Sequence, residues 1–160
     1  MTQNNLKHMN ILRLPLFFAA FLTCSGLAAQ KQDKAIQAVI NRFFEGMSKG
    51  DTALLKSACT ANPLMQTYMA GSDGAMTVLT EPFSEFVSFV GAPHKDTYLE
   101  KIEFGAIHAE KSLASVWTPY KFYLNGKLRH CGTNSFQLVK TGDGWKIQYI
   151  IDTRRKEGCD

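Results

Sequence analysis

The stretch from His130 to Asn134, read His-Cys-Gly-Thr-Asn, holds side chains that could do chemistry. A histidine beside a cysteine is a pairing used in nucleophilic catalysis and in metal sites. Along a strand, however, successive side chains point to opposite faces of the sheet. If this stretch is a strand, His130 and Cys131 cannot act together, and each side chain needs its own interpretation.

Two turns that flank this stretch predict its strand partners. Asn125-Gly126 favours a two-residue hairpin, and Thr-Gly-Asp-Gly at 141–144 marks a second hairpin. The second turn predicts three facing pairs: Leu138 with Ile147, Phe136 with Tyr149, and Asn134 with Ile151. This register gathers apolar side chains on one face together with His130 and Asn134, and it turns Asp152 to the other face.

The strand before Asn125-Gly126 allows two facings. Continuous pairing from the turn places Trp117 opposite Asn134, on the face of His130. Pro119 cannot donate a ladder hydrogen bond, and a bulge there would turn Trp117 outward. With Trp117 inward, the remaining apolar side chains form an outer patch of the kind found at oligomer interfaces: Val116, Tyr120 and Phe122.

The elements that position these residues divide the chain into a helical front and a strand-rich rear. Helical spacing and capping residues predict helices that begin at Asp33, Asp51 and Thr80. Two short strands are expected between the second and third helices, over 64–70 and 75–80. Alternating apolar residues predict four longer strands, over 98–108, 112–124, 127–140 and 144–154.

The first 29 residues have the order of a secretory signal peptide. A basic start is followed by the apolar run Leu14–Leu22, which is too short to span a membrane, and then by small residues. We expect cleavage after Ala29 and export to the periplasm or the medium. Cleavage before Cys24 is the alternative, and a lipid on that cysteine would tether the protein to a membrane. Residues 30–160 then form one domain.

Charge and cysteine content exclude several classes of function. Removal of Lys7 and Arg13 with the signal peptide leaves 16 of the 18 basic residues, against 14 acidic residues. The resulting net charge of +2 does not favour nucleic-acid binding. No metal-ligand spacing is present, and we predict neither a metal nor a cofactor. Cys59, Cys131 and Cys159 allow three disulfide pairings, of which we favour Cys131 with Cys159.

Two segments carry a resemblance to a known family. The opening "AVINRFFEGMSKGDTALLKSAC" and the closing hairpin "FQLVKTGDGWKI" resemble the nuclear transport factor 2-like superfamily, and within it the secreted bacterial proteins grouped as lumazine-binding. The resemblance implies an α+β, cone-shaped, cystatin-like fold, with three helices from the N-terminal half packed on a curved antiparallel sheet. It also implies a pocket inside the cone and a homodimer formed through the sheet.

Two functions fit this sequence. The first is an exported protein that binds a small, flat or apolar ligand, with Trp117, His130, Asn134 and Tyr149 as contacts; a lumazine-like heterocycle is implied only by the resemblance. The second is an enzyme of the isomerase, dehydratase or hydrolase type with His130 as general base. A purely structural role for His130 stays open beside both.

Overall fold

The computed structural model describes residues 19–159, and the chain divides into one unit that ends at Lys31 and another from Gln32 to Asp160. The architecture below is that of the second unit. The predicted signal peptide, residues 1–29, lies largely outside the described residues, so export remains a prediction. Within residues 19–159, no helix has the length and apolar content that a membrane crossing requires.

Three helices precede or interrupt the sheet: α1 (Ala19–Lys49), α2 (Thr52–Ser57) and α3 (Phe83–Gly91). Asp51 caps α2 as expected, because its carboxylate accepts a hydrogen bond of 2.9 Å from the Leu54 amide. Two other expected N-caps were wrong. Asp33 lies inside α1, and Thr80 lies in a strand, so that Pro82 precedes α3 instead.

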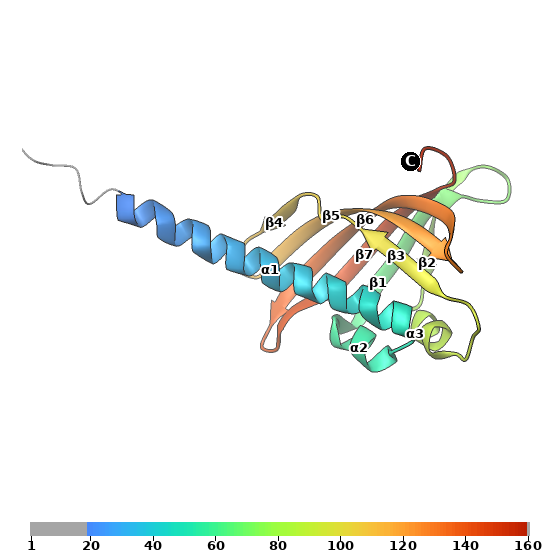
Figure 1. Ribbon diagram of the computed structural model, residues 1–160, viewed down its shortest axis with the longest axis horizontal. Helices are drawn as coiled ribbons and strands as arrows, with labels where there is room; N and C mark the ends of the chain where they lie inside the picture. Colours follow the sequence, from blue (N-terminus) through green and yellow to red (C-terminus); the bar gives the residue numbers. More distant parts are fainter. Residues whose placement is uncertain (1–18, 160) are drawn as a thin grey trace, which may run out of the picture. The chain divides into compact units, whose positions relative to one another are not determined.

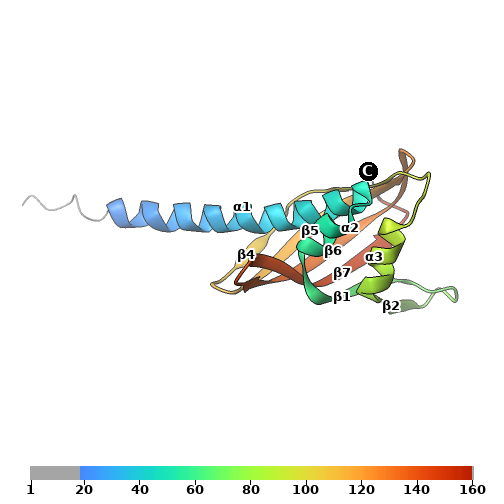
Figure 2. The ribbon, with the colours of Figure 1, turned by 90° about the horizontal axis from the view of Figure 1, so that it is seen from below.

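Seven strands form one sheet: β1 (Cys59–Ala70), β2 (Met76–Glu81), β3 (Tyr98–Ile102), β4 (Ile107–Ala109), β5 (Leu113–Leu124), β6 (Lys127–Thr141) and β7 (Gly144–Arg155). Their order is β2-β1-β7-β6-β5-β3, and β4 also pairs with β5 (Figures 1 and 2). The α+β fold class is confirmed. The sheet is mixed rather than wholly antiparallel, because β1 runs parallel to β7.

The segment expected as one strand over 98–108 is two strands, and Pro119 explains the break. The Glu103 amide donates to the Pro119 carbonyl at 2.9 Å, but proline has no N–H to return the second bond of the pair. Pairing with β5 stops at Ile102 and resumes at Ile107.

Two β-bulges set which side chains face inward. Leu138 lies opposite Ile147 as expected, but Gln148 then has no partner and Gln137 lies opposite Tyr149. In β6, Phe122 pairs with His130 and Tyr123 pairs with Leu128, so Arg129 between them has no partner. One extra residue in a strand moves every later side chain to the opposite face.

The bulges correct the expected facings of side chains on both β5 and β7. Phe136 lies opposite Ile150 and Asn134 lies opposite Asp152, so Asp152 points inward and Tyr149 outward. The side chains expected as an outer apolar patch point inward, and Trp117 points outward, because the bulge at Arg129 shifts β5 by one residue against β6. The inward-facing residues of the expected outer patch are Val116, Tyr120 and Phe122.

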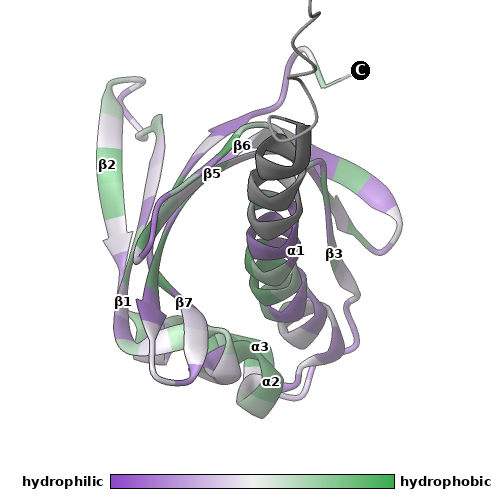
Figure 3. Cartoon of the chain, turned by 90° about the vertical axis from the view of Figure 1, so that its left-hand side faces the viewer, coloured by the Kyte–Doolittle hydropathy of each residue, from purple (hydrophilic) through white to green (hydrophobic). Residues whose placement is uncertain are grey.

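The sheet curves around the second half of α1, and α2 and α3 lie near the end of that helix (Figure 3). The apolar stripe of α1 supplies Ile36, Ile40 and Phe43 to the core, each almost fully buried. Their partners from the sheet include Leu138 and Ile147, which are completely buried. Burial of these side chains holds the helix inside the curve of the sheet.

Candidate functional site

A cavity of about 420 Å³ lies between α1, α3 and the concave face of the sheet. One part of its lining is apolar and mostly aromatic, formed by Phe43, Phe44, Met47, Phe86, Val90 and Phe136. Phe43 stacks on Phe86 at 5.8 Å between ring centroids, and Phe44 meets Phe136 edge-on at 5.9 Å. This part of the cavity continues the hydrophobic core.

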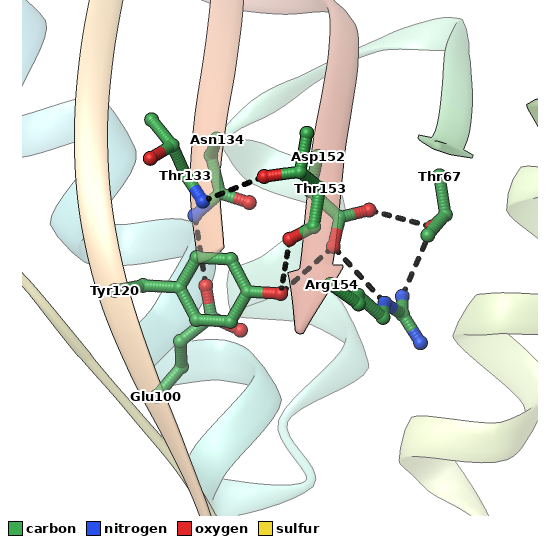
Figure 4. A network of polar contacts seen from close by, with 8 residues as sticks. All are labelled: Thr67, Glu100, Tyr120, Thr133, Asn134, Asp152, Thr153 and Arg154. Carbon is green, nitrogen blue, oxygen red and sulfur yellow. Dashed lines mark hydrogen bonds and ion pairs between the residues drawn. The ribbon is translucent and has the colours of Figure 1, made fainter. Parts of the chain in front are cut away.

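A second part of the lining is polar and centres on Asp152 of β7 (Figure 4). The Tyr120 hydroxyl lies 2.9 Å from Asp152 Oδ2 and 3.0 Å from the Thr153 carbonyl, so it can donate to either oxygen. Thr67 Oγ1 donates to Asp152 Oδ1 at 2.5 Å. Arg154 donates through Nε to Asp152 Oδ2 at 3.0 Å and through Nη2 to Thr67 Oγ1 at 3.1 Å. Both oxygens of the buried carboxylate are therefore satisfied.

Glu100 of β3 forms a second polar group in the cavity. Its Oε1 accepts a hydrogen bond of 2.8 Å from Asn134 Nδ2 (Figure 4). Burial raises the pKa of the Glu100 carboxyl to about 7; Asn134 and Arg154 oppose the rise, and Asp152 adds to it. A carboxyl that titrates near neutrality can either donate or accept a proton at physiological pH.

His130 lines the same cavity, on an aromatic surface. Its ring stacks on Phe122 at 4.8 Å and meets Tyr120 edge-on at 5.7 Å. Burial lowers the pKa of His130 below its usual value, and the positive charge of Arg154 adds to the effect. The imidazole is therefore uncharged at neutral pH.

Tyr120 also titrates outside its usual range. Burial is the main cause that raises the pKa of Tyr120, and the negative charges of Asp152 and Glu100 raise it further. The phenol therefore stays protonated and acts as a hydrogen-bond donor at neutral pH.

Gly132 explains how Tyr120 reaches this network. A Cβ atom at Gly132 would lie 1.7 Å from the Thr153 carbonyl oxygen and 2.9 Å from the Tyr120 ring. The Tyr120 ring thus occupies the room that the missing side chain leaves, directly opposite Gly132 in the ladder. A protein side chain therefore takes the room beside this glycine.

The four expected ligand contacts separate into two pairs. The structure places His130 and Asn134 in the cavity. Trp117 is 53% exposed on the outer face, where it lies opposite Ser135. Tyr149 is also on the outer face, and its hydroxyl donates to Gln66 Oε1 at 2.8 Å. Expecting these two residues inside was wrong, because each bulge shifts one strand by a single residue.

Cysteine chemistry lies away from the cavity. Cys131 and Cys159 form a disulfide with their Cα atoms 5.6 Å apart, and Cys131 points away from His130. Cys59 is a free, buried thiol, and burial raises its pKa to about 12, which keeps it unreactive at neutral pH. Among the residues that the structure describes, no three His, Cys, Asp or Glu side chains are placed to hold a metal ion.

Sequence reasoning missed four residues of the site: Glu100, Tyr120, Asp152 and Arg154. One signal was present for Tyr120. The alternation Val116, Thr118, Tyr120 and Phe122 is less polar than the intervening set, which contains Pro119 and Lys121. No comparable signal marked Glu100, because its neighbours in the cavity come from strands far along the chain.

No family model matches this chain, and no curated protein matches it. Solved structures do. A protein from Planctomyces limnophilus is 18% identical with a TM-score of 0.64, over 79% of this chain and 98% of that one. A nuclear transport factor 2-like protein of unknown function from Shewanella baltica is 16% identical with a TM-score of 0.62, over 79% and 96%.

A third solved structure, a domain of unknown function from Nostoc punctiforme with a cystatin-like fold, is 14% identical with a TM-score of 0.58, over 80% of each chain. At these identities the likeness concerns the fold. The order of elements, the curved sheet and these neighbours agree: the chain has the nuclear transport factor 2-like fold.

Proposed function

We propose that the protein binds a small ligand with a flat, apolar body and a polar end in the cavity between α1, α3 and the sheet. One observation carries the proposal. The cavity joins an aromatic wall, with Phe43, Phe86 and Phe136, to a cluster of polar side chains from β3, β6 and β7. Ligand sites in proteins combine these two features, because apolar walls supply affinity and a few placed polar groups orient the ligand.

The test uses the purified chain and bicyclic heterocycles. Lumazine is one probe, because the resemblance to lumazine-binding proteins suggests it, and tryptophol is a second probe with an apolar ring. We expect at least one bicyclic probe to raise the melting temperature, since a ligand at 100 times its Kd adds about 2.7 kcal/mol of stability.

Two matched variants locate the binding. Met65 lines the cavity, and Met69 lies on the same face of β1 outside it. Met65→Trp fills the cavity and should abolish the thermal shift, whereas Met69→Trp should leave the shift unchanged. The proposal fails if no bicyclic probe stabilises the wild type, or if Met65→Trp retains the shift.

A specific observation favours a second candidate, an enzyme of the isomerase, dehydratase or hydrolase type. Glu100 has a pKa of about 7 inside a partly apolar cavity, which suits a general acid or base at neutral pH. His130, the base expected from the sequence, has a lowered pKa and is a weaker base there. Proton exchange distinguishes Glu100 from His130 as the base. Glu100→Gln should stop α-proton exchange of 2-indanone in D₂O, and His130→Ala should not. Absence of exchange by the wild type contradicts this candidate for carbon acids.

We also propose export and a homodimer through the outer face of the sheet. Leu113 and Trp117 are 49% and 53% exposed and share the outer face of β5, which supports an apolar contact there. Trp117→Lys should convert a dimer to a monomer in sedimentation measurements. A monomeric wild type rules out the dimer, and retention of the protein in the cytoplasm rules out export.

A further inference from the structure

We propose that the ligand is a protonated organic amine with a flat apolar body, whose ammonium group binds the Glu100 carboxylate beside the rings of Tyr98 and Phe122. This inference rests on the proposed binding function and names the chemical class of the ligand. Three features of the cavity support it: its balance of charge, the aromatic rings around Glu100, and the hydrogen bonds that Glu100 makes.

Carboxyl groups outnumber basic groups in the cavity. Glu81, Glu100 and Asp152 line it, and Arg154 is the basic side chain with a fixed charge in the lining. Arg154 is bound to Asp152 at 3.0 Å, and His130 is uncharged at neutral pH. Two carboxyl groups therefore have no basic partner in the lining. An anionic ligand would meet repulsion here, and a cationic ligand would meet attraction.

Glu100 is the better placed of the two carboxyls to hold a buried cation. Glu100 is half-buried, whereas Glu81 is exposed, and both line the cavity. Among the described residues, Asn134 is its side-chain partner, and that bond uses Oε1, leaving Oε2 for a ligand N–H. The raised pKa of Glu100 is what an under-compensated carboxyl shows, and a bound cation would stabilise its ionised form.

Aromatic residues are the neighbours of Glu100 on its face of the sheet. Glu100 lies opposite Phe122 in the ladder, and Tyr98 is two residues before it on the same face of β3. Tyr98 and Phe122 stack at 6.3 Å, and Phe89 lies 5.3 Å from Tyr98. The faces of aromatic rings attract cations, and the attraction is stronger where water is excluded. A carboxylate beside such rings suits an ammonium group better than a neutral hydroxyl.

Three indole probes with different charges test the proposal on the full chain: tryptamine is a cation, tryptophol is neutral and indole-3-propionate is an anion. At pH 8 we expect tryptamine to bind about tenfold more tightly than tryptophol, as a charge-assisted hydrogen bond allows, and the anion to bind most weakly. Glu100→Gln should weaken tryptamine about tenfold and leave tryptophol within about threefold. Glu103→Gln, at an exposed carboxyl just beyond β3, is the matched control and should change neither.

Acidity gives a second readout. The other titratable groups that line the cavity are Tyr98 on β3, Tyr120 on β5, His130 on β6, Asp152 and Arg154 on β7, and Glu81 on β2. Below pH 7 Glu100 takes up a proton, so the affinity for tryptamine should fall about tenfold from pH 8 to pH 6. The amine of tryptamine stays charged over this range, and Glu100→Gln should remove the dependence.

Several outcomes overturn the amine proposal. If tryptophol binds as tightly as tryptamine and Met65→Trp abolishes its binding, the ligand is not an amine but the cavity still binds ligands. If Glu81→Gln weakens tryptamine binding and Glu100→Gln does not, the ammonium group binds at Glu81 and the assignment to Glu100 is wrong. Absence of tryptamine binding also overturns the proposal, and the heterocycle screen then decides the binding function separately.

Discussion

The two halves of the concave face differ sharply, although β5, β6 and β7 build both. In the first half, the rows across these strands are Ala114, Leu138 and Ile147, then Val116, Phe136 and Ile150. In the second half they are Thr118, Asn134 and Asp152, then Tyr120, Gly132 and Arg154. The first half packs against α1 as core, and much of the second half lines the cavity.

The difference shows that a bulge can place polar side chains on a strand face that the sequence pattern predicts to be apolar. Without the extra residue at Gln148, Tyr149 and Ile151 would face inward, and Asp152 and Arg154 would face outward. With it, Asp152 and Arg154 face inward instead. The apolar half is stabilised by burial, and the polar half depends on hydrogen bonds that satisfy buried charges.

The largest expected effect comes from adding one methyl group in the polar half. Gly132→Ala would drive its Cβ into the Thr153 carbonyl oxygen, so the strands or the Tyr120 ring must shift. We expect the free energy of unfolding to fall by about 3 kcal/mol or more. Gly142→Ala is the control, since nothing lies within 4 Å of its Cβ position, and it should change stability by less than about 0.5 kcal/mol. Equal effects in urea unfolding would contradict the close packing of β6 on β7.

A second effect, on the order of 2–3 kcal/mol, concerns the pH dependence of stability. The pKa of Glu100 is raised from 4.5 to about 7 in the folded protein, so the folded state holds this proton to higher pH than the unfolded state does. Its contribution to stability is therefore lost as the pH rises from about 4.5 to about 7. Glu100→Gln should reduce the slope of the unfolding free energy against pH over this range. Glu103→Gln should keep the wild-type slope, and an unchanged slope in Glu100→Gln would argue against a buried carboxyl.

An intermediate effect on stability compares tyrosine hydroxyls on the two faces of the sheet. Tyr120→Phe removes an inward hydroxyl that donates to Asp152 or Thr153, and it should cost about 1–2 kcal/mol because a buried carboxylate loses a donor. Tyr149→Phe removes an outward hydroxyl that donates to Gln66, and it should cost less than about 1 kcal/mol because water can replace it. The opposite order in thermal unfolding would show that the facings of the two tyrosines are reversed.

The smallest effect lies at the boundary between the halves. Thr118 is fully buried, and its Oγ1 has no hydrogen-bond partner within the described part of the chain. Thr118→Val keeps the shape and removes this hydroxyl, so we expect stability to be unchanged or to rise by about 0–1 kcal/mol. A loss of more than 1 kcal/mol would place a hydrogen-bonding partner at this position and move the boundary of the polar half toward the core.

Local patterns predicted much of the fold. Asn125-Gly126 and the turn at 141–144 mark both hairpins, because their backbone angles demand these residue types. Alternation along β6 correctly placed His130 and Asn134 on the concave face, although ligand binding by either residue stays a prediction. Trp117, Tyr149 and Asp152 were misplaced, since each lies beyond a bulge that nothing in the local pattern announces.

The sequence by itself determined the element types, the two hairpin turns, the separation of His130 from Cys131 and the resemblance to the nuclear transport factor 2-like fold. These follow from short-range geometry: turn angles, capping and the alternation of side chains. Only the tertiary structure decided that Glu100 meets Asn134 and that Tyr120 and Arg154 meet at Asp152. Such contacts join residues from different strands, and a bulge of one residue reverses them, so their positions depend on how the whole sheet pairs around α1.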